Sequence, residues 1–229
     1  MQAGARACFA ATSPARTLEA LAELLGRLQD GGSAMAGPGV HEVSARLSAE
    51  RAEAEDRAEA GLADVEALAA ALERLLAGSR AARGFEPPFR VVERRVRWAW
   101  RRLRRAGNRV RGASDGRRLH DLRVTVKKLR YILEAFSPLA PVEARAAVAP
   151  LKVLQEELGT VHDCDELHER VLACVTGAED RLADALCDLD LDLARARVKA
   201  YEGFRAAWRK PARTELRKAL AMFCAAVAA

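Results

Sequence analysis

Hydrophobic residues recur at helical spacing along most of the chain, and no stretch alternates polar and apolar residues as a β-strand would. Gly and Pro separate the helical stretches. Before residue 85, the pattern predicts helices at about 14–30 and 40–77, the first capped by Ser13 and opened by Pro14. The later helices are predicted at about 89–106, 118–136, 142–158, 161–174, 178–210 and 211–226, and Pro150 can split the third of these. The pattern therefore predicts an all-α protein built from antiparallel helical bundles.

Two stretches of this pattern resemble each other faintly. LAELLGRLQD at 21–30 aligns with VLQEELGTVHD at 153–163 when Gly26 is set on Gly159, an offset of 159 − 26 = 133 residues. A chance match between Ala/Leu-rich stretches is the alternative. A basic helix precedes the second stretch, and the offset places its counterpart ahead of the first residue. We therefore interpret the chain as one compact domain of two pseudo-repeated halves: a partial repeat at 1–84 that lacks its basic opening helix, and a second repeat at 85–229.

Composition supports a folded helical chain. Half of the 229 residues are hydrophobic and only 5% are aromatic, which allows a core and disfavours sheets. The five cysteines lie far apart without a CxxC pair, so we expect buried or half-buried thiols in a reducing compartment. No run approaches the roughly 20 apolar residues of a membrane span, and no secretory leader is evident. We expect a soluble cytoplasmic protein that does not engage a membrane.

Positive charge is concentrated in one segment. Between Arg90 and Arg130 there are sixteen Lys and Arg residues against three acids, a net charge of +13, whereas the whole chain carries +6. The remaining residues therefore sum to −7 (6 − 13). The alternative is that these cations form surface salt bridges with the Glu-rich stretch at 50–66. Each surface salt bridge, however, stabilises a protein by only about 0–1 kcal/mol. A polyanion neutralises many charges at once and releases its counterions, so we expect a polyanionic ligand.

Two consecutive predicted helices each carry these charges on one face, opposite an apolar face. In the helix at 118–136, Leu122, Leu129 and Leu133 share the apolar face. The opposite face carries His120, Arg123, Lys127, Arg130 and Tyr131, with Lys128 to the side. In the helix at 89–106, the basic face carries Arg94, Arg97, Arg101, Arg104 and Arg105, together with Trp98. If the helices pack antiparallel, the two basic faces border one groove. Because Arg forks and Lys bind phosphate oxygens, the regular spacing suits a repeated phosphate.

Other chemistry has weaker signals. A histidine and acid cluster at 162–169 (His162, Asp163, Asp165, His168, Glu169) matches no metal-site pattern, so we interpret these residues as partners that orient nearby arginines. We predict neither a metal nor a cofactor. The sequence holds no P-loop, nucleophile elbow or H-E-x-x-H motif, so we do not expect an enzyme.

The segments LHDLRVTVKKLRYILEAF at 119–136 and LKVLQEELGTVHDCDEL at 151–167 resemble the CHAD family, the conserved-histidine α-helical domain. Its members share an H-x-x-R-V-x-x-K/R-K/R-L-R-Y helix and an L-Q-x-x-L-G-x-x-x-D segment. The resemblance is specific over about 89–229 and loose over 14–80. It implies two bundles in a pseudo-twofold arrangement, with a central basic groove that binds inorganic polyphosphate. His120, Arg123, Lys127, Lys128, Arg130 and Tyr131 match the motif helix, whereas Arg94, Arg97, Arg101 and Arg105 match by charge alone.

The leading expectation is therefore non-enzymatic binding of inorganic polyphosphate. The resemblance also suggests localisation to polyphosphate granules. Nucleic acid is the second candidate ligand, because Trp98 and Tyr131 could stack on bases. A triphosphatase is less well supported: the family's companion E-x-E-x-K signature is approached only by EAEDR at 53–57, which lacks the lysine. A phosphatase-associated or acid-binding scaffold is the remaining alternative. Without its first basic helix, the chain would bind more weakly or complete its site as a homodimer.

Overall fold

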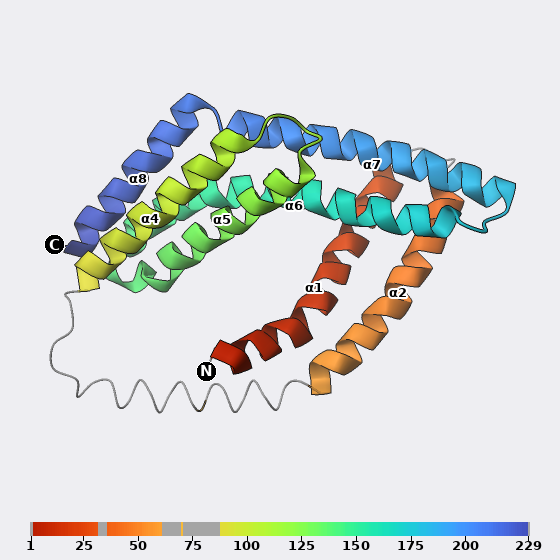
Figure 1. Ribbon diagram of the computed structural model, residues 1–229, viewed down its shortest axis with the longest axis horizontal. Coiled ribbons are helices and arrows are strands. Elements are labelled where there is room, and N and C mark those ends of the chain that lie inside the picture. Colours follow the sequence, from red (N-terminus) through yellow and green to blue (C-terminus); the bar gives the residue numbers. More distant parts are fainter. Residues whose placement is uncertain (1, 32–35, 61–69, 71–87, 229) are drawn as a thin grey trace. The chain divides into compact units, whose positions relative to one another are not determined.

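The computed structural model describes residues 2–31, 36–60, 70 and 88–228, and Figure 1 shows their arrangement. Within these ranges the protein consists of seven α-helices and one short 3-10 helix, without a β-strand. The helices are α1 (Gln2–Gly31), α2 (Gly37–Ala60), α4 (Pro88–Arg109), α5 (Gly116–Ala135), η2 (Ser137–Leu139), α6 (Pro141–Val175), α7 (Asp180–Ala207) and α8 (Lys210–Ala228). The all-α prediction is confirmed. No helix in the described ranges is long and apolar enough to cross a membrane.

Contacts divide the chain into two compact units, each made of two separate stretches of sequence. Unit 1 comprises Met1–Gly84 and Glu166–Leu193, and unit 2 comprises Phe85–Asp165 and Ala194–Ala229. The helices α6 and α7 each contribute to both units. The expected repeat relationship between residues 1–84 and 85–229 stays a prediction.

Unit 1 is held together by the pairing of α1 with α2. Leucines of α1 (Leu18, Leu21, Leu24, Leu25) and apolar residues of α2 (Val40, Val43, Leu47) are buried. The first turn of α2 requires a glycine, since a Cβ added at Gly39 would lie 2.8 Å from the carbonyl oxygen of Ala185 in α7. Farther along α2 the exposed residues form ion pairs within the helix, such as Arg51 Nε to Glu55 Oε1 at 2.7 Å.

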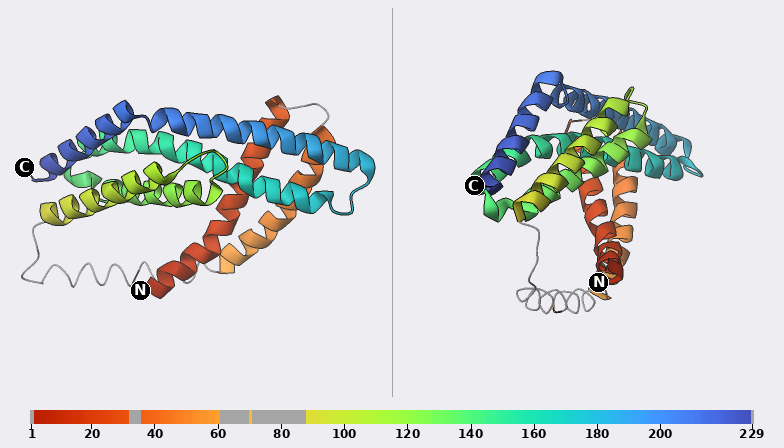
Figure 2. Two further views of the ribbon diagram at one scale, coloured as in Figure 1. Left: turned by 45° about the horizontal axis from the view of Figure 1, so that its top comes forward. Right: turned by 60° about the vertical axis from the view of Figure 1, so that its left-hand side comes forward.

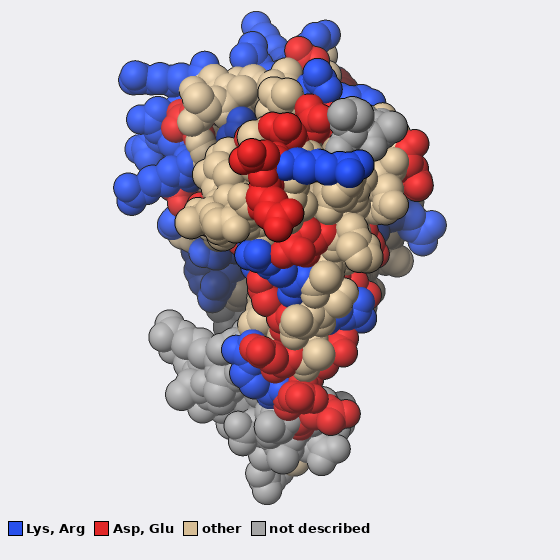
Figure 3. All heavy atoms as spheres, turned by 90° about the vertical axis from the view of Figure 1, so that its right-hand side faces the viewer, with Lys and Arg blue, Asp and Glu red and all other residues tan. Residues whose placement is uncertain are grey.

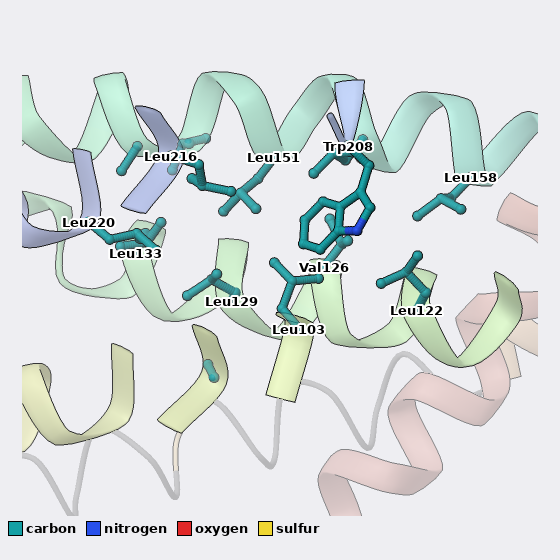
Figure 4. Close-up of a cluster of buried hydrophobic side chains, with 14 of the residues drawn as sticks. Leu103, Leu122, Val126, Leu129, Leu133, Leu151, Leu158, Trp208, Leu216 and Leu220 are labelled. Carbon is teal, nitrogen blue, oxygen red and sulfur yellow. The ribbon is translucent and has the colours of Figure 1, made fainter. Parts of the chain in front are cut away.

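Unit 2 contains a continuous apolar core to which all of its helices contribute. The helix α4 packs on α5 and α8, and α4 and α5 lie side by side in every view (Figure 2). The core includes Val92, Val96 and Leu103 of α4, Leu122, Val126, Leu129 and Leu133 of α5, Leu151, Leu154 and Leu158 of α6, and Phe204, Trp208, Leu216, Leu220 and Phe223 from the C-terminal segment. Figure 4 shows part of this cluster, with the Trp208 ring pointing in toward Leu103 and Val126. The predicted apolar faces of α4 and α5 are confirmed.

Two predicted helix boundaries are wrong. The helix α1 begins at Gln2 instead of Pro14, so Ser13 is not its N-cap and the proline lies inside the helix. A proline removes one backbone hydrogen bond and strains the preceding turn, but the Ala-rich segment before it favours helix strongly enough to continue. Similarly, α6 is a single helix of 35 residues that includes both Pro150 and Gly159.

The reason for the unbroken α6 is its buried stripe. Ala147, Leu151, Leu154, Leu158 and Val161 are at most 2% exposed and recur at helical spacing on both sides of Pro150 and of Gly159. Tertiary packing therefore outweighs the local preference for a break. The part of the predicted 40–77 helix beyond Ala60 lies outside the described residues, apart from Ala70.

Four cysteines, Cys164, Cys174, Cys187 and Cys224, are free thiols. Cys164 and Cys174 are buried and Cys224 is half-buried, as expected, but the prediction is wrong for Cys187, which is exposed. Burial raises the pKa of the Cys174 thiol and that of Cys224, so both favour the unreactive protonated form at neutral pH.

Candidate anion-binding site

The basic side chains of α5 lie opposite its buried leucines. Arg123, Lys127 and Arg130 are half-buried, whereas His120 and Tyr131 are exposed. We call these five residues the motif face. Lys128 is also exposed but projects from the side of the helix. Since the apolar face is anchored in the core of unit 2, helical geometry fixes where the motif face points.

The neighbour of the motif face is α6. The ring of His120 packs edge-on against that of His162, with ring centroids 5.2 Å apart. One turn farther along α5, the Nε of Arg123 lies 4.0 Å from where a Cβ at Gly159 would be. Arg123 therefore lies along α6 at van der Waals distance from position 159. The sequence analysis did not predict that Gly159 and His162 flank the motif face, although a glycine within an otherwise uninterrupted apolar stripe was the available signal.

The cations of the motif face differ in how far they are neutralised. Arg130 donates from Nη1 to Glu134 Oε1 at 2.8 Å, and its guanidinium lies 4.7 Å from the centroid of the Tyr131 ring. Among the described residues, no acidic side chain pairs with Arg123, Lys127 or Lys128. The Nε atoms of Arg123 and Arg130 are buried and have no hydrogen-bond partner within the described part of the chain. The face therefore keeps positive charge and unused donors.

A clamp of Asp165 and Arg197 holds the start of α5 in place. Arg197 of α7 donates from Nε to Asp165 Oδ1 at 2.5 Å and from Nη1 to the carbonyl oxygen of Ala113 at 2.7 Å. Ala113 belongs to the loop that leads into α5. A Cβ at Gly116, the first residue of α5, would lie 3.5 Å from Asp165 Oδ2. The clamp thus ties this loop to α6 and α7 within unit 2.

The other residues of the 162–169 cluster have separate roles. His168 Nδ1 lies 2.5 Å from Asp190 Oδ1 in unit 1, and Glu166 accepts a hydrogen bond from Arg170 at 3.3 Å. Asp165 therefore pairs with an arginine, as expected, whereas His168 pairs with an acid, Asp190. Within the described ranges, no group of three His, Cys, Asp or Glu residues could hold a metal ion.

The arginines of α4 do not all lie beside the motif face. Arg97 pairs with Glu93 at 2.6 Å and lines a hollow between α4 and α8, and Arg104 lines a second hollow against α8. Arg101 and Arg105 are exposed, and Arg94 has an interaction partner. A groove bordered by the basic faces of α4 and α5 stays a prediction. The contacts associate the α5 face with α6, and two of the five predicted α4 arginines with α8.

Figure 3 shows one side of the molecule, on which Lys and Arg side chains lie together (blue, upper left), apart from a group of acidic residues (red).

The exposed Trp98 ring is in contact with an arginine. Trp98 is 49% exposed, and the Arg102 guanidinium lies 5.4 Å from its ring centroid.

The all-α fold and the cationic face of α5 can be compared with what is known of protein families. The sequence model of the CHAD domain matches residues 1–172, three quarters of the chain. The protein therefore belongs to the CHAD domain family, as the motifs of α5 and α6 indicated. The match includes α1 and α2, where the sequence resemblance was loose, and it ends inside α6, before α7 and α8. The family is associated with polyphosphate-related proteins. Neither the curated proteins nor the solved structures gave a match.

Proposed function

We propose that the motif face binds inorganic polyphosphate without catalysing its cleavage. The observation that carries the proposal is the unneutralised charge of this face: Arg123 and Lys127 have no acidic partner among the described residues. The buried Nε of Arg123 also lacks a hydrogen-bond partner within that part of the chain. Unpaired buried donors are costly, and an anion would satisfy them.

The spacing of the cations favours a chain of phosphates over a single phosphate. Arg123, Lys127 and Arg130 are separated by four and three residues, so they recur on one side of α5. At 1.5 Å per residue, the three charges extend over about 10 Å of the helix axis. A linear polyanion can contact all three at once, and its binding should weaken steeply with salt because counterions are released.

Nucleic acid is the competing ligand for the same face. Tyr131 is 46% exposed and could stack on a base, but the Arg130 guanidinium already lies against its ring. The Arg102 guanidinium lies against the Trp98 ring in the same way. A base that stacked on the same ring face would have to displace the cation–π contact, whereas phosphate binding leaves it in place. This favours an inorganic phosphate chain.

The test is a salt titration of binding to long-chain polyphosphate, with RNA at equal phosphate concentration as competitor. The triple variant R123A/K127A/R130A should lose most of the affinity, and its log–log salt slope should fall by roughly one per cation removed. The matched control R145A/K152A/R181A removes three exposed cations outside the Arg90–Arg130 segment and should bind almost like the wild type.

Circular dichroism must show intact helices in both variants, since all six positions lie outside the buried core. Unchanged binding by the folded triple variant would place the site elsewhere. Displacement of polyphosphate by RNA at equal phosphate concentration would contradict the proposed selectivity and indicate a general basic surface.

A further inference from the structure

The turn between α7 and α8 contains a second cationic surface, which shares no lining residue with the motif face. Two hollows of about 350 Å³ and 270 Å³ adjoin there and share Lys210 and Arg213. The first is also lined by Asn108, Trp208 and the other cations of the turn, and the second by Trp100 and residues of α4 and α8. We call this surface the α8 corner; its cations are Arg104, Arg205, Arg209, Lys210, Arg213 and Arg217.

The charge of the α8 corner is unbalanced. No Asp or Glu is among the described residues that line either hollow. The nearest acid along α8, Glu215, accepts a hydrogen bond from Lys218 at 2.8 Å. The hollows also lie at the start of a helix of 19 residues, where the helix dipole adds positive potential. Six cations that share two hollows repel one another, and an anion would relieve that repulsion.

Arg213 is held in one orientation at the centre of the α8 corner. It donates from Nη1 to Asn108 Oδ1 at 2.9 Å, and its guanidinium lies 5.5 Å from the centroid of the Trp208 ring. Its Nε is buried and has no hydrogen-bond partner within the described part of the chain. A fixed guanidinium with an unused donor is suited to a phosphate oxygen, because little side-chain entropy is lost on binding.

The floor of the α8 corner is rigid. Trp208 is 8% exposed, and its ring centroid lies 6.4 Å from that of Trp100. A Cβ added at Gly107 would lie within 2.6 Å of three atoms of the same ring, so α4 packs directly against it. Figure 4 shows the other side of the ring in the core of unit 2. The cations of the corner are thus arranged around a fixed aromatic floor.

We propose that the α8 corner binds a short linear oligophosphate, as a second site that is independent of the motif face. A molecule of two or three linked phosphates carries several charges and can contact both hollows, whereas one phosphate group can occupy only one of them. Five of the six cations lie beyond residue 172, outside the stretch that matches the CHAD domain. Most of the cations of the corner therefore lie in the part of this chain that the family match does not cover.

The tryptophans beneath the α8 corner allow binding to be followed by fluorescence. The chain contains three tryptophans, and replacing Trp98 by Phe leaves Trp100 and Trp208, which line the two hollows. Titrating W98F with pyrophosphate and with tripolyphosphate at physiological salt should give a saturable change in fluorescence. Inorganic phosphate and sulfate should bind at least about tenfold more weakly, since each can make only part of the charged hydrogen bonds.

Two variants in the W98F background test the location of the site. R209A/K210A removes two exposed cations and should raise the apparent Kd about tenfold or more. R123A/K127A/R130A should leave the Kd for tripolyphosphate unchanged. Absence of a saturable signal, equal binding of sulfate, or an unaffected R209A/K210A variant would each overturn the proposal, as would loss of tripolyphosphate binding in the motif-face variant.

Parallel measurements identify the source of the phosphates and separate the two proposals. ATP binding as tightly as tripolyphosphate would point to a nucleoside triphosphate, and weaker ATP binding would point to a free phosphate chain; both results support the site. Long-chain polyphosphate binding that survives R209A/K210A and is lost in R123A/K127A/R130A would sustain the motif face whatever the outcome at the corner.

Discussion

Replacing Gly107 by Ala tests the packing of α4 on Trp208. Alanine stabilises a helix interior by roughly 0.5–1 kcal/mol relative to glycine. At this position, however, the new methyl group would lie within 2.6 Å of three atoms of a ring that is 8% exposed. The ring cannot move away easily, because Trp100 and Arg213 also contact it. Overpacking of a core costs about 1–3 kcal/mol, so we expect a net loss of about 1–2 kcal/mol.

Two other helical glycines provide matched controls. At Gly26 in α1, a Cβ would meet nothing within 4 Å in the described part of the chain, so Gly26→Ala should stabilise by about 0.5–1 kcal/mol. At Gly203 in α7, a Cβ would lie within 2.5 Å of the Glu157 carboxyl group. That group is the end of a flexible side chain that can turn aside, so the effect of Gly203→Ala should be intermediate.

The three free energies of unfolding can be measured by urea denaturation followed by far-UV circular dichroism, with tryptophan fluorescence as a second probe. The expected order of stability is Gly26→Ala, then Gly203→Ala, then Gly107→Ala, with the wild type above the last. Stabilisation by Gly107→Ala to the same extent as by Gly26→Ala would refute the reasoning, because it would mean that the Trp208 ring does not fill the space beside α4.

Two further predictions concern the core and the acidic pH range. Leu129 is fully buried, so Leu129→Ala should lower the free energy of unfolding by about 2–5 kcal/mol; a urea-denaturation change below about 1 kcal/mol would contradict its place in the core. Burial, followed by the nearby charge of Glu156, raises the pKa of Glu157, so the folded state favours the protonated acid and loses stability as the pH rises through this pKa. Glu157→Gln should therefore raise the melting temperature at pH 7, with the gain disappearing below about pH 4; a gain of the same size at every pH would argue against this origin.

The sequence was sufficient to predict which sides of α4 and α5 are buried. Their apolar residues recur at helical spacing, and burial of Val96, Leu103, Leu122 and Leu129 follows directly from that period. The spacing of the apolar residues does not predict which other helices pack beside α4 and α5, because that depends on contacts between residues far apart in the chain. The neighbour of the motif face, α6, and the association of Arg97 and Arg104 with α8 could therefore be learned only from the structure.

Predictions from single residues were wrong where packing between distant parts of the chain determines the structure. Pro150 and Gly159 both suggested breaks, yet the buried stripe of α6 runs through them. The α8 corner was missed for a related reason. Its cations are dispersed between Arg104 and Arg217 instead of forming a dense run, so a search for charge density along the sequence favoured the Arg90–Arg130 segment.

The division of each unit between distant stretches of sequence has a consequence for synthesis on the ribosome. The core of unit 2 joins Val92 of α4 to Phe223 of α8. During translation, the hydrophobic faces of α4, α5 and α6 are made long before Trp208, Leu216 and Phe223 exist to cover them. Domains usually fold as their chain emerges, but here α8 must appear before the core can close. The nascent chain thus carries exposed apolar faces until α8 has been made, and during that time these faces can aggregate.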